Sequence, residues 1–204
     1  MTGQYRGNPI SCHFKKWGLR RDYTPAPQKD EIIAYLHGAA HDGTHSKAHK
    51  TFRISQKYED WLMLIKALLG TLNIKSWIYK EGMNRNIYVL ETSDRLFLTK
   101  HLPRSGKEKI AYIRGYFDSE GGFPKSLGMW QYIQFSQKNL LDLIQVKTYL
   151  EQLSIICGKT HNPTQKDKSY FRFYISRKSH NKFMSTIGSW HPRKSRDIEY
   201  RMKI

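Results

Sequence analysis

Cysteine is scarce in this chain, which contains only Cys12 and Cys157 among its 204 residues. Two cysteines are too few for a disulfide framework or a cysteine-rich zinc site. Long apolar runs are also missing, and the first residues lack the apolar segment of a secretory signal. These absences predict a protein that is not secreted, has no membrane partner, and acts inside the cell, in the cytoplasm or an organelle.

Acidic residues are outnumbered two to one, because 17 Asp and Glu face 35 Lys and Arg, giving a net charge of +18. A small domain needs a net charge of only about 2–8 to stay soluble. The excess predicts a polyanionic partner. Nucleic acid is the first candidate, because no Lys/Arg-rich amphipathic helix points to a membrane surface. With 39% hydrophobic and 13% aromatic residues, the chain should fold around a core.

An internal repeat organises the chain. Residues 110–115 echo residues 33–38, and residues 133–138 echo residues 52–57. The segments at 52–57 and 133–138 have strand-like patterns, and each is followed by an amphipathic helical pattern. Periodicity predicts helices at 28–42, 58–72 and 140–153, strands at 51–56, 77–79, 86–91, 133–138 and 170–175, and a short helix at 94–101. Repetition of one α+β unit predicts two similar halves.

Charge and turn residues divide the chain further. Both ends are strongly basic and the middle is nearly balanced, so the middle should hold most of the core. Pro103 and Gly106 mark a connection between the two copies of the repeat. We expect a basic N-terminal extension at 1–28, a first half at 29–101, a linker at 102–107, a second half at 108–190 and a basic C-terminal tail at 191–204.

Each half opens on a similar segment. Residues 113–121 read Ile-Arg-Gly-Tyr-Phe-Asp-Ser-Glu-Gly, and residues 35–43 read Tyr-Leu-His-Gly-Ala-Ala-His-Asp-Gly, one residue shorter between the glycines. Residues 113–121 resemble the motif of the LAGLIDADG homing endonucleases. The motif pair and the repeat resemble the small single-chain, two-motif members over about residues 29–190. The resemblance implies an α+β fold of two pseudo-symmetric αββαββα halves, with paired motif helices at the interface and saddle-shaped antiparallel sheets.

Small residues recur at four-residue spacing in both motif segments. Side chains four residues apart share one face of a helix, so such a face is smooth enough for another helix backbone to approach closely. Glycine inside a helix costs about 1 kcal/mol relative to alanine, and close packing is a compensating use. The expected helix interface consists of Ala34, Gly38, Ala111 and Gly115.

Both motifs end in an acid followed by glycine. Two carboxylates brought together at helix C-termini repel each other and the helix dipoles, and a divalent cation relieves both effects. The resemblance implies two or more Mg²⁺ ions bound by Asp42, Gly43, Glu120 and Gly121, with the two acids catalytic. His41 is the alternative to Asp42, because one missing residue turns a helix by about 100°.

A Ser-Gln-Lys segment ends the first long strand of each half. Glutamine can orient a water molecule, and lysine can stabilise charge that develops on a phosphate. In the family that the motifs resemble, polar and basic side chains from this part of each half surround the metal site. The further catalytic candidates are Gln56, Lys57, Gln137 and Lys138, with Lys125 after the second motif.

Basic and aromatic side chains alternate along the expected strands. A sheet can lie in the major groove of DNA and read base edges. By resemblance, a saddle-shaped sheet from each half does so here. The DNA-binding candidates are Arg53, Lys80, Arg85, Arg172, Arg177 and Lys178.

Together with these observations, the resemblance implies a monomeric, Mg²⁺-dependent, site-specific double-strand DNA endonuclease. By resemblance, it would cut one phosphodiester per strand of a long asymmetric site and mobilise an intron or a free-standing element. The alternative is a non-cleaving relative, either an intron maturase that binds RNA or a DNA-binding regulator. A third hypothesis, an unrelated basic RNA-binding α+β domain, treats the repeated motifs as chance. Replacing Glu120 by Gln separates these classes. A nuclease should lose DNA cleavage and keep DNA binding, whereas a pure binder should be unaffected.

Overall fold

The computed structural model describes residues 15–16, 26–82, 84–124, 131–164 and 166–202. The first half comprises α2 (Lys29–Ala39), the 3-10 helix η1 (Ala40–Asp42), β1 (Gly43–Ser46), β2 (Thr51–Gln56), α3 (Glu59–Thr71), β3 (Trp77–Lys80), β4 (Tyr88–Thr92) and the 3-10 helix η2 (Leu96–Leu98). The second half comprises α4 (Gly106–Glu120), β5 (Gly121–Gly122), β6 (Gln134–Gln137), α5 (Leu140–Gln152), β7 (Phe171–Tyr174), the 3-10 helix η3 (Arg177–Ser179), α6 (His180–Thr186) and α7 (Pro192–Met202).

Each half contains one antiparallel sheet. The strand orders are β1-β2-β4-β3 and β5-β6-β7. Two backbone bridges, Cys157–Ile175 and His161–Arg172, place residues 157–161 beside β7, as β3 lies beside β4 in the first half. The two halves therefore share one plan, and the predicted α+β fold with antiparallel sheets is confirmed.

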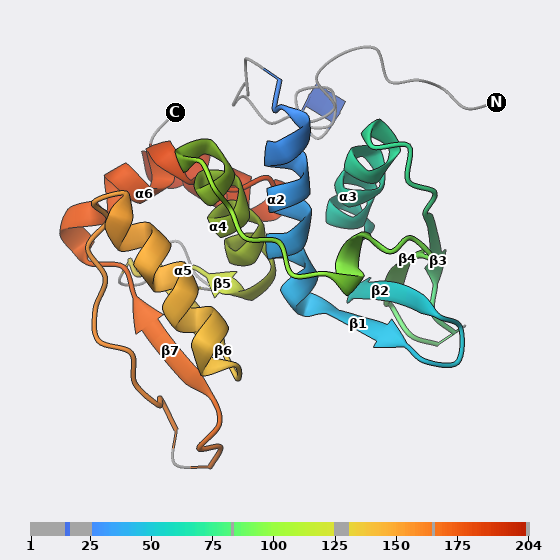
Figure 1. The fold of residues 1–204 in the computed structure, drawn as a ribbon. Coiled ribbons are helices and arrows are strands. Elements are labelled where there is room, and N and C mark those ends of the chain that lie inside the picture. Colours follow the sequence, from blue (N-terminus) through green and yellow to red (C-terminus); the bar gives the residue numbers. More distant parts are fainter. Residues whose placement is uncertain (1–14, 17–25, 83, 125–130, 165, 203–204) are drawn as a thin grey trace.

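Helices α2 and α4 pack side by side between the two sheets, and each leads at its C-terminal end into the first strand of its sheet (Figure 1). Their contact passes through Gly38 and Gly115. A Cβ atom on Gly38 would lie 2.1 Å from the carbonyl oxygen of Tyr112, and one on Gly115 would lie 2.1 Å from that of Tyr35. The two glycines thus allow the backbones to touch, and Ala34 and Ala111 are buried in the core nearby.

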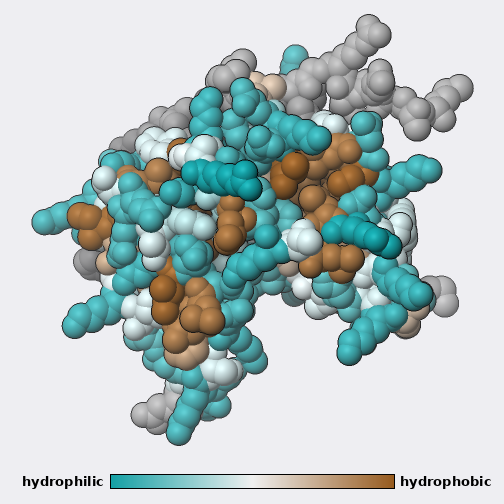
Figure 2. All heavy atoms as spheres, in the orientation of Figure 1, coloured by the Kyte–Doolittle hydropathy of each residue, from teal (hydrophilic) through white to brown (hydrophobic). Residues whose placement is uncertain are grey.

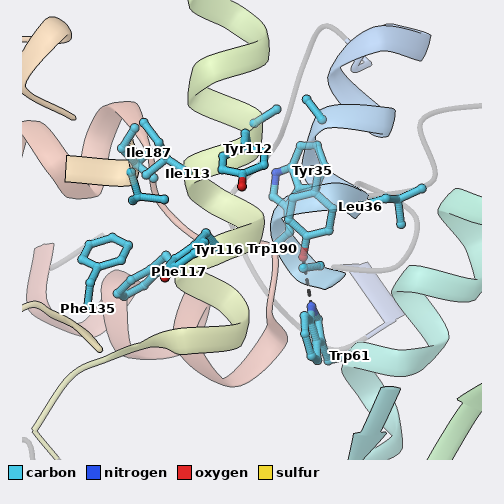
Figure 3. Packing of buried hydrophobic residues seen from close by; sticks show 14 of the residues in the cluster. Tyr35, Leu36, Trp61, Tyr112, Ile113, Tyr116, Phe117, Phe135, Ile187 and Trp190 are labelled. Atoms are coloured by element: carbon cyan, nitrogen blue, oxygen red, sulfur yellow. Dashed lines mark hydrogen bonds between the residues drawn. The ribbon is translucent and has the colours of Figure 1, made fainter. Parts of the chain in front are cut away.

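One hydrophobic core runs through both halves. Figure 3 shows large rings of α4 and α2 packed with Trp61 of α3 and Trp190, which precedes α7. The Trp61 ring nitrogen donates a hydrogen bond to the Tyr35 hydroxyl at 2.9 Å, and the Tyr35 and Trp190 rings lie 4.4 Å apart. Burial of such side chains is the main favourable term in folding. The halves are therefore parts of one cooperative core.

Three predicted boundaries are corrected by the structure. The expected helix at 94–101 is only the short η2. Helix α4 begins inside the expected linker because Ser105 and Glu108 form a capping box that fixes its first turn. The expected basic tail at 191–204 is helical in its described part, where residues 192–202 form α7 and the side chains of Lys194 and Ile198 are buried.

The surface is rich in hydrophilic side chains, as the high net charge predicts. Figure 2 shows hydrophilic residues projecting over most of one face, with hydrophobic residues gathered in separate patches. Within the described ranges, no helix is long and apolar enough to cross a membrane.

Candidate active site

Two acids lie at corresponding ends of the central helices. Asp42 closes η1 directly after α2, and Glu120 closes α4. The side-chain amide of Gln56, the last residue of β2, donates to the Asp42 carboxylate. The side-chain amide of Gln137, the last residue of β6, donates to the Glu120 carboxylate at 2.8 Å. The structure thus brings the two acids and the two glutamines into two matching pairs.

The 3-10 turn at the end of the first motif offsets its missing residue. From Gly115 to Glu120, five α-helical steps advance about 7.5 Å and turn about 500°. From Gly38 to Asp42, one α-helical and three 3-10 steps also advance about 7.5 Å and turn about 460°. The mismatch shrinks from the expected 100° to about 40°. Tightening of the last turn therefore lets Asp42 reach a position equivalent to that of Glu120.

His41 points to a different part of the molecule. Its Nε2 atom is hydrogen-bonded to the Tyr112 hydroxyl at 2.8 Å, and its Nδ1 atom lies 3.8 Å from the Asp142 carboxylate. These partners belong to α4 and α5, on a pocket that His37, Lys100 and His101 also line. The structure pairs Asp42, not His41, with the glutamine at the end of β2.

The two acids share an environment that opposes their charge. Desolvation and the charge of Asp42 raise the pKa of Glu120 to about 7, against a lowering effect of the Gln137 hydrogen bond. Desolvation by surrounding protein raises the pKa of Asp42 to about 6, although the residue as a whole is exposed. The negative charge of Asp42 therefore strengthens the preference of Glu120 for a bound cation or a proton.

Replacing Glu120 by Gln should stabilise the metal-free protein at high pH only. The folded protein binds more protons at Glu120 than the unfolded chain does between the ordinary pKa of 4.5 and about 7. The free energy of unfolding therefore falls as pH rises through this window. Glutamine cannot ionise, so the variant avoids that loss. Because Glu120 is only half-buried, solvent screens part of the penalty, and we expect a gain of about 1 kcal/mol.

The measurement is urea unfolding in chelator at about pH 4 and at about pH 8, because these values bracket the window in which linkage acts. The variant should match the parent protein at the lower pH and exceed it at the higher. An equal difference at both values would contradict the raised pKa and indicate a packing effect.

The glycines after the acids are required by neighbouring rings. A Cβ atom on Gly43 would lie 2.1 Å from the Phe52 ring, and one on Gly121 would lie 2.0 Å from the Phe117 ring. The Gly121 carbonyl, an expected metal ligand, accepts a hydrogen bond from the Lys194 ammonium at 2.8 Å. Since that positive charge competes with a cation at the same oxygen, the two carboxylates are the stronger candidates for metal binding.

Sequence reasoning missed Lys194 and Asp118. Asp118 is buried inside α4 and accepts hydrogen bonds from the Tyr35 hydroxyl at 2.7 Å and from the backbone amides of Trp190 and His191 at 2.9 and 3.0 Å. It thereby joins both motif helices to the segment before α7. Its place among large apolar residues was the available signal, whereas Lys194 sits in a run of basic residues that looks solvated.

The lysine candidates are less closely tied to the acids. Lys57 and Lys138 follow the two glutamines and are exposed, and the Lys138 ammonium pairs with the Asp167 carboxylate at 3.1 Å. Lys125 lies outside the described residues.

Strand register decides which candidates share the sheet face turned away from the core. In the first sheet, Arg53 pairs with Glu91, and Glu91 pairs with Trp77. Cross-strand partners lie on one face, so these residues and Tyr79 form a polar and aromatic surface. Arg53 donates to the Tyr79 hydroxyl and lies 3.6 Å from the Glu91 carboxylate.

Lys80 does not share that face. It pairs with Tyr88, and alternation along β3 and β4 puts this pair on the side of Ile78 and Leu90, toward the core. Arg85 is exposed in the turn between β3 and β4, within 3.8 Å of the Glu81 carboxylate. Arg177 and Lys178 were expected on a strand but lie in η3, beyond the end of β7.

Arg172 occupies the corresponding face of the second sheet. It pairs with Ser136 of β6, while the neighbouring Phe135 and Phe173 point into the core. The Arg172 guanidinium donates to the Tyr174 hydroxyl at 3.1 Å. Each half therefore offers one arginine braced by a tyrosine, Arg53 and Arg172, on its outward sheet face.

Comparison with known proteins agrees with this architecture. Residues 107–188 match the family described as LAGLIDADG-like domain. No curated protein sequence matches the chain closely. Most of the second half of the chain is thus similar to a LAGLIDADG-like domain.

Similar solved structures indicate which type of LAGLIDADG protein the chain resembles. I-DmoI in complex with DNA and Mn is 25% identical with a TM-score of 0.61, covering 79% of this chain and 98% of that one. I-DmoI in complex with DNA and Ca is 24% identical with a TM-score of 0.65, covering 85% and 100%. Full-length DUF199/WhiA from Thermatoga maritima is 16% identical with a TM-score of 0.65, covering 98% and 68%. The predicted resemblance to a single-chain, two-motif homing endonuclease is confirmed.

Proposed function

We propose that this protein is a metal-dependent, site-specific double-strand DNA endonuclease that hydrolyses one phosphodiester in each strand. The observation that carries the proposal is the symmetric pair of acids. Asp42 and Glu120 each end a central helix, and each accepts a hydrogen bond from the glutamine at the end of the neighbouring strand. A duplex has two chemically equivalent strands, so two equivalent acidic sites suit one cut in each. The similarity to I-DmoI, a homing endonuclease solved with DNA, supports this activity.

The acids fit divalent cations bound jointly with substrate. Among the described residues, no three His, Cys, Asp or Glu side chains gather to bind a metal by themselves. Mg²⁺ commonly binds one or two carboxylates together with substrate phosphates. Desolvation raises the pKa values of Asp42 and Glu120 although the charge of Lys194 lowers them, so a cation bound beside these carboxylates would relieve the remaining penalty. The chemistry supplied by bound Mg²⁺ is activation of water and neutralisation of charge at the leaving oxygen. Gln56 and Gln137 would hold the carboxylates in place for this purpose.

The outward sheet faces supply the DNA surface. Arg53 and Arg172 lie there in register with polar neighbours, and the net charge of +18 favours a polyanion. Both motif halves belong to one chain, so a monomer can present both acids to an asymmetric duplex. Residues 29–101 and 108–190 would then each bind one half of a long target site.

The test begins with the genomic neighbourhood of the reading frame. Joining the flanking sequences gives a candidate uninterrupted target, which is labelled and incubated with the protein in Mg²⁺, in Ca²⁺ and in chelator. We expect a double-strand cut in Mg²⁺ only and binding without cutting in Ca²⁺. A panel of randomised duplexes is tested in parallel, so that the target can be recovered even when the junction is not the target. Failure to cut any member of that panel in Mg²⁺ or Mn²⁺ would reject the nuclease.

A non-cleaving binder is the second candidate. The fold is shared at a TM-score of 0.65 with DUF199/WhiA, which is not described as an endonuclease. Tight binding to the duplex without cleavage favours a DNA-binding regulator. Tighter binding to RNA transcribed from the same locus favours a maturase.

A further inference from the structure

All of the hydrogen-bond donors of the Lys194 ammonium group bind to the end of one helix. An ammonium group has three donors. The Lys194 Nζ atom donates to the carbonyl oxygens of Phe117 at 2.6 Å, Asp118 at 2.8 Å and Gly121 at 2.8 Å. All three acceptors belong to the last turn of α4 and the residue after it, on either side of Glu120.

A helix C-terminus does not ordinarily need a buried ammonium group to satisfy its carbonyl oxygens. Free carbonyls at a helix C-terminus can be satisfied by water or by backbone turns, whereas burying an ammonium is expensive unless charge and hydrogen bonds compensate. Lys194 is only 9% exposed. The compensation comes from Asp118, Asp42 and Glu120, whose negative charges all act on this ammonium, and from the negative end of the α4 dipole.

The C-terminal segment is anchored to α4 at a second point. The backbone amides of Trp190 and His191 donate to the Asp118 carboxylate, directly before α7 delivers Lys194. The LAGLIDADG-like domain match ends at residue 188, so these contacts come from chain beyond the matched repeat. Helix α7 therefore supports the end of α4 from beyond the matched domain.

We propose that Lys194 is a positioning residue of the active site, which fixes the last turn of α4 so that Glu120 holds its place opposite Asp42. This inference rests on the proposed nuclease function for its catalytic consequence, while its structural part stands without it. Lys194 makes no contact of its own with either carboxylate, because its three donors are already used. Its effect reaches the acids through the backbone and through its charge.

The test compares Lys194→Met, which keeps the apolar stem, with Lys194→Arg, which keeps the charge. Lys182→Met is the matched control, because it removes one positive charge from an exposed site on α6. The single-turnover cleavage rate in Mg²⁺ and the DNA affinity in Ca²⁺ are measured for each. Lys194→Met should lower the rate about 10–100-fold with affinity within about threefold, as for other residues that orient metal-binding groups. Lys194→Arg should recover most of the rate, and the control should match the parent protein.

Hydrogen exchange separates this inference from the proposed function. The Gly121 amide donates to the Phe117 carbonyl, so loosening of this turn should speed exchange at Glu120 and Gly121 in Lys194→Met but not in Lys182→Met. If the parent protein cuts no DNA, faster exchange still supports the positioning role and only the nuclease is rejected. Unchanged exchange and an unchanged rate would overturn the inference. So would a parallel loss of affinity, rate and stability in Lys194→Met that Lys194→Arg does not relieve, because that pattern describes general unfolding.

Discussion

Replacing Glu120 by Gln should abolish DNA cleavage and leave DNA binding in place. Glutamine has nearly the same shape and can still bond to Gln137, but it carries no charge to hold a divalent cation. We expect the single-turnover rate in Mg²⁺ to fall by at least about 100-fold, the range seen when one electrostatic partner of a reaction is removed. Affinity for the duplex in Ca²⁺ should change little, because the proposed binding surface lies on the sheets.

Asp42→Asn should behave in the same way, since Asp42 is bonded to Gln56 as Glu120 is to Gln137. The matched control is Glu151→Gln, an identical chemical change at an exposed position on α5. Cleavage at the parent rate by the Glu120 variant would remove this acid from the chemistry. Loss of cleavage in the His41→Asn variant but not in Asp42→Asn would assign the first site to His41.

Replacing Gly115 by Ala should be the most damaging small change in the protein. The added Cβ atom would lie 2.1 Å from the Tyr35 carbonyl oxygen and 2.8 Å from the Ala39 amide nitrogen. Both are backbone atoms of α2, so no side-chain rotation can relieve the contact, and the helices must separate. Overpacking of a rigid core commonly costs about 1–3 kcal/mol, and a backbone clash at the centre of the shared core should reach at least the top of that range.

Urea unfolding and thermal melting measure the loss, and Gly38→Ala should repeat it, because its Cβ atom would lie 2.1 Å from the Tyr112 carbonyl oxygen. The control is Gly70→Ala in α3, where a Cβ atom meets no neighbour within 4 Å. There the better helix propensity of alanine should stabilise the protein by up to about 1 kcal/mol. A neutral Gly115→Ala variant would mean that the two helices do not pack backbone to backbone.

The two predictions are connected through the geometry of the central helices. Close approach at Gly38 and Gly115 sets the separation of the helix axes, and the acids lie one to two turns farther along the same helices. A variant with displaced helices that still folds should therefore lose cleavage more steeply than it loses affinity.

Local patterns in the sequence were enough to predict much of the fold. Hydrophobic periodicity located α3 and α5 to within about one residue at each end, because each helix buries one stripe of side chains. The repeated Ser-Gln-Lys segments located the ends of β2 and β6, and the spacing of small residues located the face on which α2 and α4 touch. The acids at the motif ends could be located because each stands directly before a glycine, where a helix commonly ends.

Other features required atoms that are distant in the sequence. The assignment of Asp42 over His41 depended on the 3-10 turn of η1, whose different rise and twist no residue count reveals. The separation of Lys80 from Arg53 depended on strand register, since a shift of one residue exchanges the two faces of a sheet.

What the sequence alone determined is therefore the main helices and strands of the repeat, their duplication and the acids that end the motifs, because helix and strand periodicity and helix ends are local. What only the tertiary structure decided is the surroundings of those acids. Lys194 illustrates the reason: its neighbours along the chain are basic and polar, whereas its partners lie more than 70 residues away, in the last turn of α4 and the residue after it. The desolvation and the compensating charges that make a buried ammonium stable exist only after the two halves and α7 have packed together.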